Sequence, residues 1–391
     1  MGYKAPMKTF AIISEFNPFH NGHKYILEKS KNILKNYTAI SLMSGDFVQR
    51  GDPSIIDKFS RAKSAMYAGF DMIIEMPIHI SLQAAEFFAK GSVILLDKIG
   101  VNYLCFGIEN LETSDFLEKS YFLIENNDKL EKLTRKNLEN KSFAKARYDS
   151  IASLLNDDNF ISSNNILAFE YIRAINNINS NINVLPIKRI SSLNHDDYLR
   201  KDFISSSTAI RKNIYGDYKN HLPIYSYNEI ENFKDLYNFA NYDYFYEIFK
   251  FLLLIKDKDM KNIIGYEEGL DNYLKKIANV EKDINLFLER STNKRFTTSR
   301  IKRLMLNYIL ENTQNFNDFD INFYKVLAFN KKSEPILRNP NLNSFLCKND
   351  RKNLSESDKI ILDKMIEASN LYSLATGRPL NVDYTNKVIK L

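Results

Sequence analysis

The first half of the chain alternates short apolar runs with longer stretches in which apolar residues recur every three or four positions. The short runs predict buried strands, and the periodic stretches predict helices that pack on one face. Strands and helices in this order favour right-handed β-α-β units and a parallel sheet with helices on both faces. The expected strands are residues 10–13, 39–43, 72–74 and 103–106, and the expected helices are residues 22–34, 56–68 and 84–96.

The rest of the chain is richer in helical periodicity. Residues 114–178 and 225–310 follow helical spacing for most of their length, and residues 357–374 predict a further helix. Residues 182–187 predict the last strand of the sheet, residues 324–329 predict one more strand, and residues 216–223 indicate a domain boundary. We therefore expect an α/β, Rossmann-like parallel-sheet domain over residues 1–215 and a mainly α-helical domain over residues 216–391.

Composition narrows the class of protein. Apolar residues make up 44% of the 391 residues, enough for a packed core, and the net charge of +6 permits an anionic partner without requiring one. Cys105 and Cys347 are too few for a disulfide framework or a zinc cage. No apolar run approaches the roughly 20 residues that a membrane span needs. We expect a cytoplasmic protein that does not engage a membrane.

Residues 17–23, Asn-Pro-Phe-His-Asn-Gly-His, follow the first expected strand and open the first expected helix. Open α/β sheets bind ligands beyond the carboxyl ends of their strands, where helix N-termini offer unpaired N–H donors. His20 and His23 can there donate hydrogen bonds to an α-phosphate and to departing pyrophosphate, and Gly22 lets the backbone approach a nucleotide. The alternative is that the two histidines only cap the helix.

A second motif, Ile-Ser-Ser-Ser-Thr-Ala-Ile-Arg over residues 204–211, follows the strand expected at 182–187 and leads into a helix. Ser207 and Thr208 can bind phosphate oxygens, and Arg211 can make a two-pronged phosphate contact. Capping of an amphipathic helix explains the motif equally well when it is considered alone. Neither a Walker A motif nor a G-x-G-x-x-G motif occurs, which excludes these phosphate cradles.

The pairing of H-x-G-H with S-x-T-x-I-R resembles the nucleotidylyltransferase superfamily. Longer motifs narrow the likeness: Glu-Phe-Asn-Pro-Phe-His-Asn-Gly-His at 15–23, Met-Ser-Gly-Asp-Phe-Val-Gln-Arg-Gly at 43–51, Asp-Lys-Phe-Ser-Arg-Ala at 57–62, Phe-Gly-Ile-Glu at 106–109, Asn-Asn-Ile-Leu at 164–167 and Arg-Phe-Thr-Thr-Ser-Arg at 295–300. Together they are similar to the tRNA(Met) cytidine acetate ligase family. The resemblance spans most of the chain and is most specific in its first 110 residues.

That resemblance implies an activity and a site. The family activates acetate with ATP as acetyl-adenylate, then transfers the acetyl group to N4 of the wobble cytidine of elongator tRNA(Met), forming N4-acetylcytidine. It implies catalytic roles for His20, His23 and Arg211. We expect magnesium to be carried on ATP, and the sequence assigns no residue as a metal ligand. The residues that it places against ATP are Ile13, Ser14, Glu15, Phe16, Asn17, Pro18, Phe19, His20, Asn21, Gly22, His23, Lys24, Tyr25, Ile26, Gly107, Asn164, Arg189, Ser207 and Thr208.

Acetate and ATP are both anions, so the site needs cations. Lys58 and Arg61 are one helical turn apart and would share a face, which can equally be a solvated surface. Where this chain has Asp46, the family pattern leads us to expect Asn. A carboxylate near a triphosphate is repelled unless magnesium or a cation lies between them. The candidate cations are Arg50, Lys58, Arg61, Arg189 and Arg211.

Segment 290–303 carries six basic residues and no acid. Ile301, Leu304, Met305 and Tyr308 supply one apolar helix face, which leaves the basic residues outside. A basic stripe of this kind fits contact with a phosphate backbone. A second basic run at 129–147 is better explained as an ordinary exposed helix. The residues expected to bind tRNA are Arg290, Lys294, Arg295, Arg300, Lys302 and Arg303.

Two rival functions remain open from the sequence. A small-molecule adenylyltransferase or an acetate:protein ligase of the same superfamily would share every phosphate-binding feature, and the basic segment favours an RNA substrate over both. A non-catalytic RNA-binding protein with a vestigial nucleotide fold is the other rival, against which the intact His20, Gly22, His23, Thr208 and Arg211 argue. No obligate protein partner is inferred.

Overall fold

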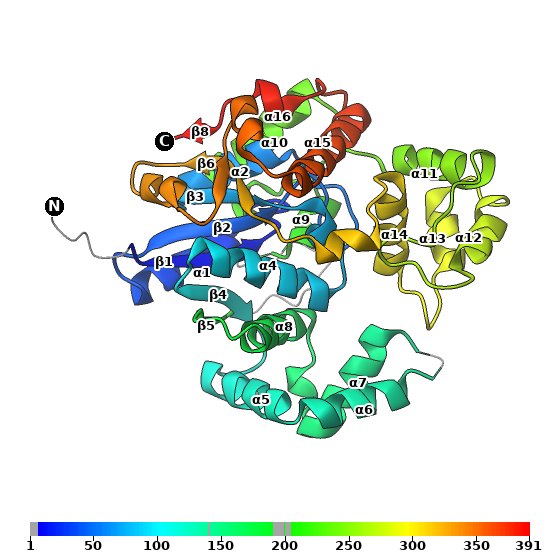
Figure 1. Ribbon diagram of the computed structural model, residues 1–391, viewed down its shortest axis with the longest axis horizontal. Coiled ribbons are helices and arrows are strands. Elements are labelled where there is room, and N and C mark those ends of the chain that lie inside the picture. The colour runs from blue at the N-terminus through cyan, green and yellow to red at the C-terminus, as the bar shows by residue number, and fades with distance from the viewer. Residues whose placement is uncertain (1–6, 140, 191–198, 200–204) are drawn as a thin grey trace.

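An eight-stranded sheet forms the centre of the computed structural model, which describes residues 7–139, 141–190, 199 and 205–391 (Figure 1). The strands lie in the order β5-β4-β1-β2-β3-β6-β7, with β8 beside β6. β1 to β5 are parallel, β6 is antiparallel to β3, and β7 and β8 are parallel to β6. The strands are β1 Thr9–Ser14, β2 Thr38–Ser44, β3 Met72–Met76, β4 Tyr103–Ile108, β5 Asn183–Lys188, β6 Phe323–Phe329, β7 Asn343–Phe345 and β8 Ile389–Lys390.

Helices cover both faces of this sheet, because the apolar residues of its strands alternate between two core clusters. Phe10 and Ile12 join one cluster with α1 and α2, whereas Ala11 joins the other with α4 and α8. The helices are α1 Asn21–Ile33, α2 Lys58–Ala68, α3 Ile78–Ser81, α4 Ala85–Ile99, α5 Thr113–Glu125, α6 Asn127–Asn137, α7 Phe143–Leu155, α8 Ser163–Asn177, α9 Ser207–Lys212, α10 Ile224–Leu236, α11 Tyr242–Lys250, α12 Leu270–Ala278, α13 Ile284–Ser291, α14 Thr298–Ile309, α15 Glu356–Thr376 and α16 Val382–Thr385.

Short 3-10 turns and one π turn complete the described part of the chain: η1 Asp158–Phe160, η2 Lys219–His221, η3 Phe251–Ile255 (the π turn), η4 Gln314–Asp318, η5 Glu334–Arg338 and η6 Lys348–Asn353. Capping residues fix where the helices against the sheet begin and end. Asp57 accepts hydrogen bonds from the N–H groups of Phe59 and Ser60 at the start of α2, and Gly69 ends that helix at φ 109°, where a side chain would be strained.

Two helical lobes project from the sheet (Figure 1). The α5–α7 lobe lies between β4 and β5 in the chain, at the bottom of the figure. The α11–α14 lobe lies between α10 and β6 in the chain, at the right of the figure. Within the described residues, no helix combines the length and apolar character needed to cross a membrane.

The α/β class, the first five expected strands and the expected helices are confirmed. The expectation that residues 182–187 form the last strand of the sheet is wrong, since β6, β7 and β8 follow and join the same sheet. Every residue of β6 is buried, and the strand pairs with β3, which would otherwise be an open edge. The sheet therefore contains strands from both sides of the predicted domain boundary at residue 215.

Candidate active site

The predicted phosphate-binding residues meet at the carboxyl ends of β1, β4 and β5. The strand order reverses between β1, which continues to β2, and β4, which continues to β5. In open α/β sheets this switch point is where ligands bind. His20 and His23 follow β1, Gly107 lies near the end of β4, and Arg189 follows β5.

His20 and His23 lie against each other at the start of α1. Their ring centroids are 3.8 Å apart, with 27° between the ring planes. Nδ1 of His20 accepts a hydrogen bond from the Gly22 N–H at 3.0 Å, and Nδ1 of His23 accepts one from the His20 N–H at 3.3 Å. The rings therefore do cap the helix. Because an accepting Nδ1 carries no proton, the proton of each neutral ring sits on Nε2, which is left to donate to a ligand.

Both imidazoles are neutral at pH 7. Burial lowers the pKa of His20 well below its usual value, and the neighbouring His23, Arg189 and Arg211 lower it further. Burial, together with the charge of Arg189, lowers the pKa of His23 to about 3. Neutral rings suit stabilisation of charge that develops on a phosphate, since they donate hydrogen bonds without having to lose a proton.

Arg211 joins the two sequence motifs. Its Nη1 donates to the main-chain oxygen of Asn17 at 2.6 Å, across 194 positions, and its Nη2 donates to Oγ1 of Thr208 at 3.4 Å. The Asn17 side-chain oxygen accepts from the N–H of Ile55 at 2.7 Å. Nδ2 of Asn17 is buried and has no hydrogen-bond partner among the residues that the structure describes. Such a donor favours a ligand that supplies the missing acceptor.

Arg189 lies over β4 because Gly107 has no side chain. A Cβ at Gly107 would be 2.9 Å from Cδ1 of Ile26 and 3.0 Å from Cδ of Arg189. Nη1 of Arg189 lies 3.6 Å from Oε1 of Glu109, and the same carboxylate accepts from Nδ2 of Asn164 at 2.6 Å. Burial lowers the pKa of Arg189, and Glu109 opposes that shift. Gly107, Asn164 and Arg189 are thus brought together as predicted.

The other predicted ATP-binding residues differ in how far their side chains are exposed to solvent. The rings of Phe16 and Phe19 are buried, so only their backbone can meet a ligand. Ser207 and Thr208 begin α9, which is capped by Ser206, and Ile204 lies outside the described residues. Ser14 and Pro18 are buried, whereas the partly exposed residues around this turn are Ile13, Glu15, Asn21, Gly22, His23, Lys24, Tyr25 and Ile26.

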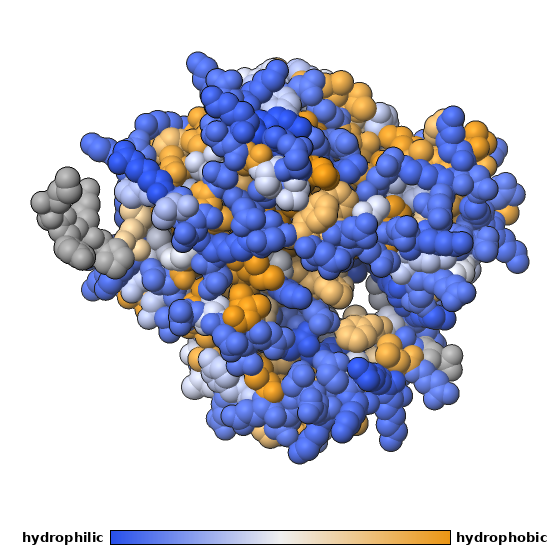
Figure 2. Space-filling view, viewed as in Figure 1, coloured by the Kyte–Doolittle hydropathy of each residue, from blue (hydrophilic) through white to orange (hydrophobic). Residues whose placement is uncertain are grey.

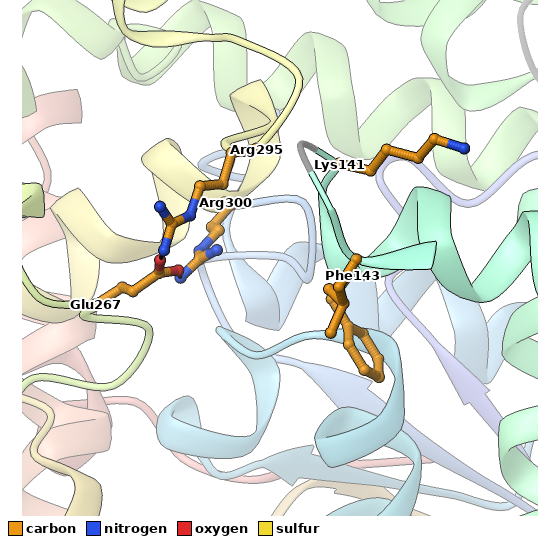
Figure 3. Close-up of a pocket in the computed structure, with 6 residues that line it drawn as sticks. Lys141, Phe143, Glu267, Arg295 and Arg300 are labelled. Atoms are coloured by element: carbon orange, nitrogen blue, oxygen red, sulfur yellow. Dashed lines mark hydrogen bonds and ion pairs between the residues drawn. The ribbon is translucent and has the colours of Figure 1, made fainter. Parts of the chain in front are cut away.

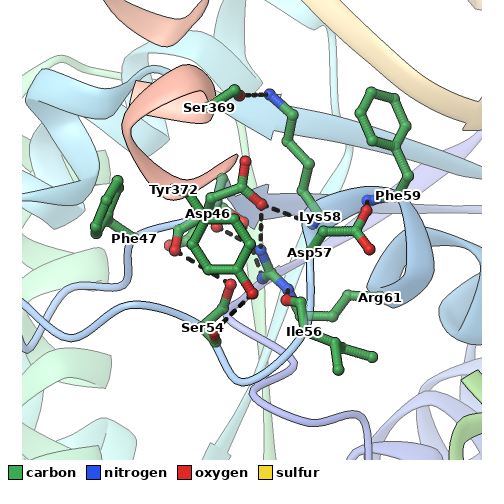
Figure 4. Close-up of polar contacts among 12 residues, drawn as sticks. Asp46, Phe47, Ser54, Ile56, Asp57, Lys58, Phe59, Arg61, Ser369 and Tyr372 are labelled. Carbon is green, nitrogen blue, oxygen red and sulfur yellow. Dashed lines mark hydrogen bonds and ion pairs between the residues drawn. The ribbon is translucent and has the colours of Figure 1, made fainter. Parts of the chain in front are cut away.

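Arg61 is not available to a substrate, contrary to the prediction (Figure 4). Its guanidinium is fully buried beneath the ends of β1 and β2, and Asp46 lies 3.9 Å away. Asp46 also accepts from the N–H of Lys58 at 2.8 Å, so its carboxylate belongs to the same interior network. Arg61 donates to the main-chain oxygens of Glu15, Ser44, Gly45 and Ile56.

Lys58 is equally buried, in what we call the charge ring: Lys58, Glu75, Lys325 and Asp383. Lys58 Nζ lies 2.8 Å from Glu75 and 2.7 Å from Asp383 and donates to Ser369 at 2.5 Å. Lys325 pairs with the same two carboxylates. The predicted exposed face of α2 is interior because α15 and α16 cover it, which a helix pattern alone does not reveal.

The six basic residues of segment 290–303 do not form one exposed stripe. Arg290, Lys294 and Arg295 are exposed, and Arg300 is half-buried. Lys302 instead binds Asp52 at 2.6 Å, and Arg303 donates to the main-chain oxygen of Gln49 at 3.2 Å. Burial and the charge of Arg300 lower the pKa of Arg303 to about 10. The apolar face of α14, including Ile301, Leu304, Met305 and Tyr308, is buried as predicted.

This docking places the basic segment beside the histidine turn. The Gln49 N–H donates to Oε1 of Glu15 at 2.9 Å, and Glu15 directly follows β1. Burial raises the pKa of Glu15, while the Gln49 N–H, Arg50 and Arg211 oppose that shift. The sequence did not single out Gln49, a neutral loop residue whose only signal was its place in the motif at 43–51.

A model of the family described as HIGH Nucleotidyl Transferase matches residues 7–386. The fold, the switch-point site and this match define the class: the chain belongs to the HIGH nucleotidyl transferases. The tRNA(Met) cytidine acetate ligase of Thermosipho africanus is 34% identical, over 98% of this chain and 99% of its own. The Clostridium perfringens protein of the same name is 33% identical, over 97% of this chain and 98% of its own. The chain therefore belongs to the tRNA(Met) cytidine acetate ligase family.

Two crystal structures of Thermotoga maritima TmcAL share the whole fold. The apo form superposes with a TM-score of 0.86 and the form bound with alpha-thio ATP with a TM-score of 0.85, each at 28% identity. Each comparison covers 98% of this chain and 100% of the other. The resemblance to that family, inferred from motifs concentrated in the first 110 residues, thus extends over the second half of the chain as well.

Proposed function

We propose that this protein is an ATP-dependent ligase that activates acetate as acetyl-adenylate and transfers acetyl to N4 of the wobble cytidine of elongator tRNA(Met). The observation that carries the proposal is the neutral pair His20 and His23, stacked at the β1–β4 switch point with Arg189 and Arg211 nearby. The names of the relatives support the substrate, and the ATP analogue bound by the Thermotoga protein supports the nucleotide.

In the first step an acetate oxygen attacks the α-phosphorus, a new P–O bond forms, and the bond to pyrophosphate breaks. Negative charge grows on the phosphate oxygens as this happens. The Nε2–H groups of His20 and His23 donate to those oxygens, and Arg189 and Arg211 supply positive charge. No nucleophilic side chain is needed, because acetate itself is the nucleophile.

In the second step the N4 amine of cytidine attacks the carbonyl carbon of the mixed anhydride, AMP leaves, and the amine loses a proton. The main requirement is position, since the amine must reach an intermediate that lies against the histidine turn. The contacts from Arg303 to Gln49 and from Gln49 to Glu15 place the basic segment close to that turn. This arrangement favours an RNA substrate over a small molecule or a protein.

Magnesium enters this proposal on ATP. Among the described residues no group of three or more His, Cys, Asp or Glu side chains is arranged to hold a metal ion. Glu15, which lies between β1 and the histidine turn in the chain, accepts a hydrogen bond from the Gln49 N–H. The cations that remain for the triphosphate are Arg50, Arg189 and Arg211.

The test separates chemistry from RNA binding. His20→Ala should lower acetate-dependent ATP–pyrophosphate exchange about 10²- to 10³-fold, the usual effect of losing one donor to a developing oxyanion. His79→Ala is the matched control, because it removes another buried ring, one that stacks on Phe316. Exchange that survives His20→Ala with the protein folded would refute the catalytic assignment.

RNA binding is tested by a double charge reversal. Lys294→Glu with Arg295→Glu alters two exposed residues and should weaken tRNA binding, reduce its salt dependence by about two phosphate contacts, and spare the exchange reaction. Lys348→Glu with Lys352→Glu makes the same change in charge on η6, as a control. Normal tRNA binding by the first variant would overturn the RNA assignment. Exchange without acetyl transfer to tRNA would instead favour the protein-ligase alternative.

A further inference from the structure

A cleft of about 420 Å³ lies where the α5–α7 lobe faces the α11–α14 lobe. Figure 2 shows the surface hollowed between these lobes, and Figure 3 shows side chains that line the cleft. No residue of the histidine turn lines it, so it is separate from the proposed ATP site. The lining residues are Leu138, Lys141, Phe143, Glu267, Arg295 and Arg300.

One wall of the cleft is apolar. Leu138 and Phe143 are 37% and 44% exposed, although both are large hydrophobic residues. Phe143 is the first residue of α7, whose start is held by Ser142, since its hydroxyl accepts from the N–H of Lys145 at 3.3 Å. The core-facing residues of α7 lie further along the helix, so this ring is not needed to fill the core of the lobe. An exposed ring on a fixed helix start is a ready stacking platform.

The opposite wall is cationic. Arg295 and Arg300 both donate from Nη2 to the carboxylate of Glu267, on which they converge in Figure 3. Their guanidinium carbons lie 5.5 Å and 5.1 Å from the ring centre of Phe296, which keeps them in place. A guanidinium has further N–H donors beyond those spent on Glu267. Lys141 also lines the cleft, but its ammonium group pairs with Asp149 at 2.7 Å, so Arg295 and Arg300 are the cations of this wall.

An apolar plane facing a pair of fixed guanidinium groups suits a ligand that is flat and apolar on one side and anionic on the other. A nucleotide has this combination in its base and its phosphate. The volume lies within the range of sites for single small ligands, and a duplex would not fit. One unpaired nucleotide of an RNA loop is therefore the occupant that matches both walls.

The position of the cleft agrees with such an occupant. Arg295 and Arg300 belong to the basic segment, and Arg303 of the same segment contacts Gln49 next to the histidine turn. The cationic wall thus belongs to a segment that reaches the loop beside the proposed active site.

We propose that this cleft binds one unstacked nucleotide of the tRNA loop that carries the target cytidine, with its base on Phe143 and its phosphate at Arg295 and Arg300. This inference rests on the proposed function, since it takes RNA to be the substrate. The nucleotide held here is a neighbour of the target and not the target itself, whose N4 must reach the acetyl-adenylate. The cleft fixes the register of the loop over the active site.

The experiment uses the whole protein and a hairpin with the anticodon stem–loop sequence of elongator tRNA(Met), with 2-aminopurine placed at each loop position in turn. Stacking on an aromatic ring quenches this fluorophore, so we expect one loop position to be quenched on binding. Phe143→Ala should abolish that quenching and weaken binding by about 5- to 150-fold, the range for one base–aromatic stack. Phe143→Tyr should retain both signals.

Phe122→Ala is the matched control, because Phe122 is 43% exposed on α5 of the same lobe and does not line the cleft. ATP–pyrophosphate exchange should be unchanged in all three variants. If wild-type protein binds the hairpin and Phe143→Ala binds it equally well, or keeps the quenching, the cleft assignment is wrong and the proposed function stands. If wild-type protein catalyses exchange but binds no RNA, the RNA part of the proposed function fails with it.

Discussion

Asp383→Asn tests whether the charge ring is as tightly balanced as its geometry indicates. Asp383 contacts both Lys58 and Lys325, Glu75 contacts the same two lysines, and all four side chains are at most 3% exposed. Two cations and two anions make the ring neutral, so the substitution leaves one uncompensated positive charge in the core. We expect the free energy of unfolding to fall by about 3–5 kcal/mol, the usual result of removing one partner of a buried pair.

Urea unfolding followed by circular dichroism measures this loss. The control is Asp363→Asn, which removes the same group from a partly exposed surface pair with Arg351 and should cost at most about 1 kcal/mol. Replacing Lys325 by Met together with Asp383 by Leu removes one charge of each sign, leaves Lys58 paired with Glu75, and should be less harmful than Asp383→Asn alone. Equal losses for Asp383→Asn and the control would refute this account of the ring.

The pH dependence of stability provides a second measurement. Burial alone would raise the pKa of Asp383, but Lys325 and Lys58 hold it well below its usual range. A depressed folded-state pKa contributes stability that is complete above the unfolded value of about 4 and is lost as the pH falls through the folded value. We therefore expect wild-type protein to lose more stability below about pH 4 than Asp383→Asn does.

Two further substitutions test how the backbone and Arg189 are held at the site. Gly107→Ala should raise KM for ATP with little change in melting temperature, because a Cβ there displaces the aliphatic part of the Arg189 side chain. An unchanged KM would show that Arg189 does not contact the nucleotide. Arg61→Met should lower both the melting temperature and the kcat of exchange, since it removes the donor to three buried main-chain oxygens and one part-buried one, and an unmet buried acceptor costs about 1–3 kcal/mol. Normal kcat in the folded variant would limit Arg61 to a structural role.

The sequence predicted the histidine turn well because the strand, the turn and the helix are contiguous. His20, Gly22 and His23 lie within four positions, and local geometry alone brings them to the end of β1. A shared site for the two motifs was also predicted, because their pairing in one sheet indicated phosphate binding, although the contact from Arg211 to Asn17 itself was not predicted. These residues could be placed from the sequence because the order of strands, turns and helices along the chain determines which turns lie at the same edge of the sheet.

The roles of the buried cations could not be predicted from the sequence in this way. Lys58 and Arg61 have the spacing of a polar helix face, and nothing near them in the sequence shows that α15 and α16 cover that face. In the sequence, nothing distinguishes Arg303 from the other residues of the basic segment, yet its guanidinium donates a hydrogen bond to the main-chain oxygen of Gln49. In each case the residue that buries the cation lies far away in the sequence, so the local hydrophobic periodicity does not indicate the contact.

The charge ring also bears on how the protein is made. Lys58 precedes Ser369 by 311 positions and Asp383 by still more, so Glu75 is the only carboxylate of the ring that the growing chain contains until α16 is synthesised. Between the synthesis of Lys325 and that of Asp383 the ring has two lysines for one carboxylate, so it becomes neutral only when α16 has been translated.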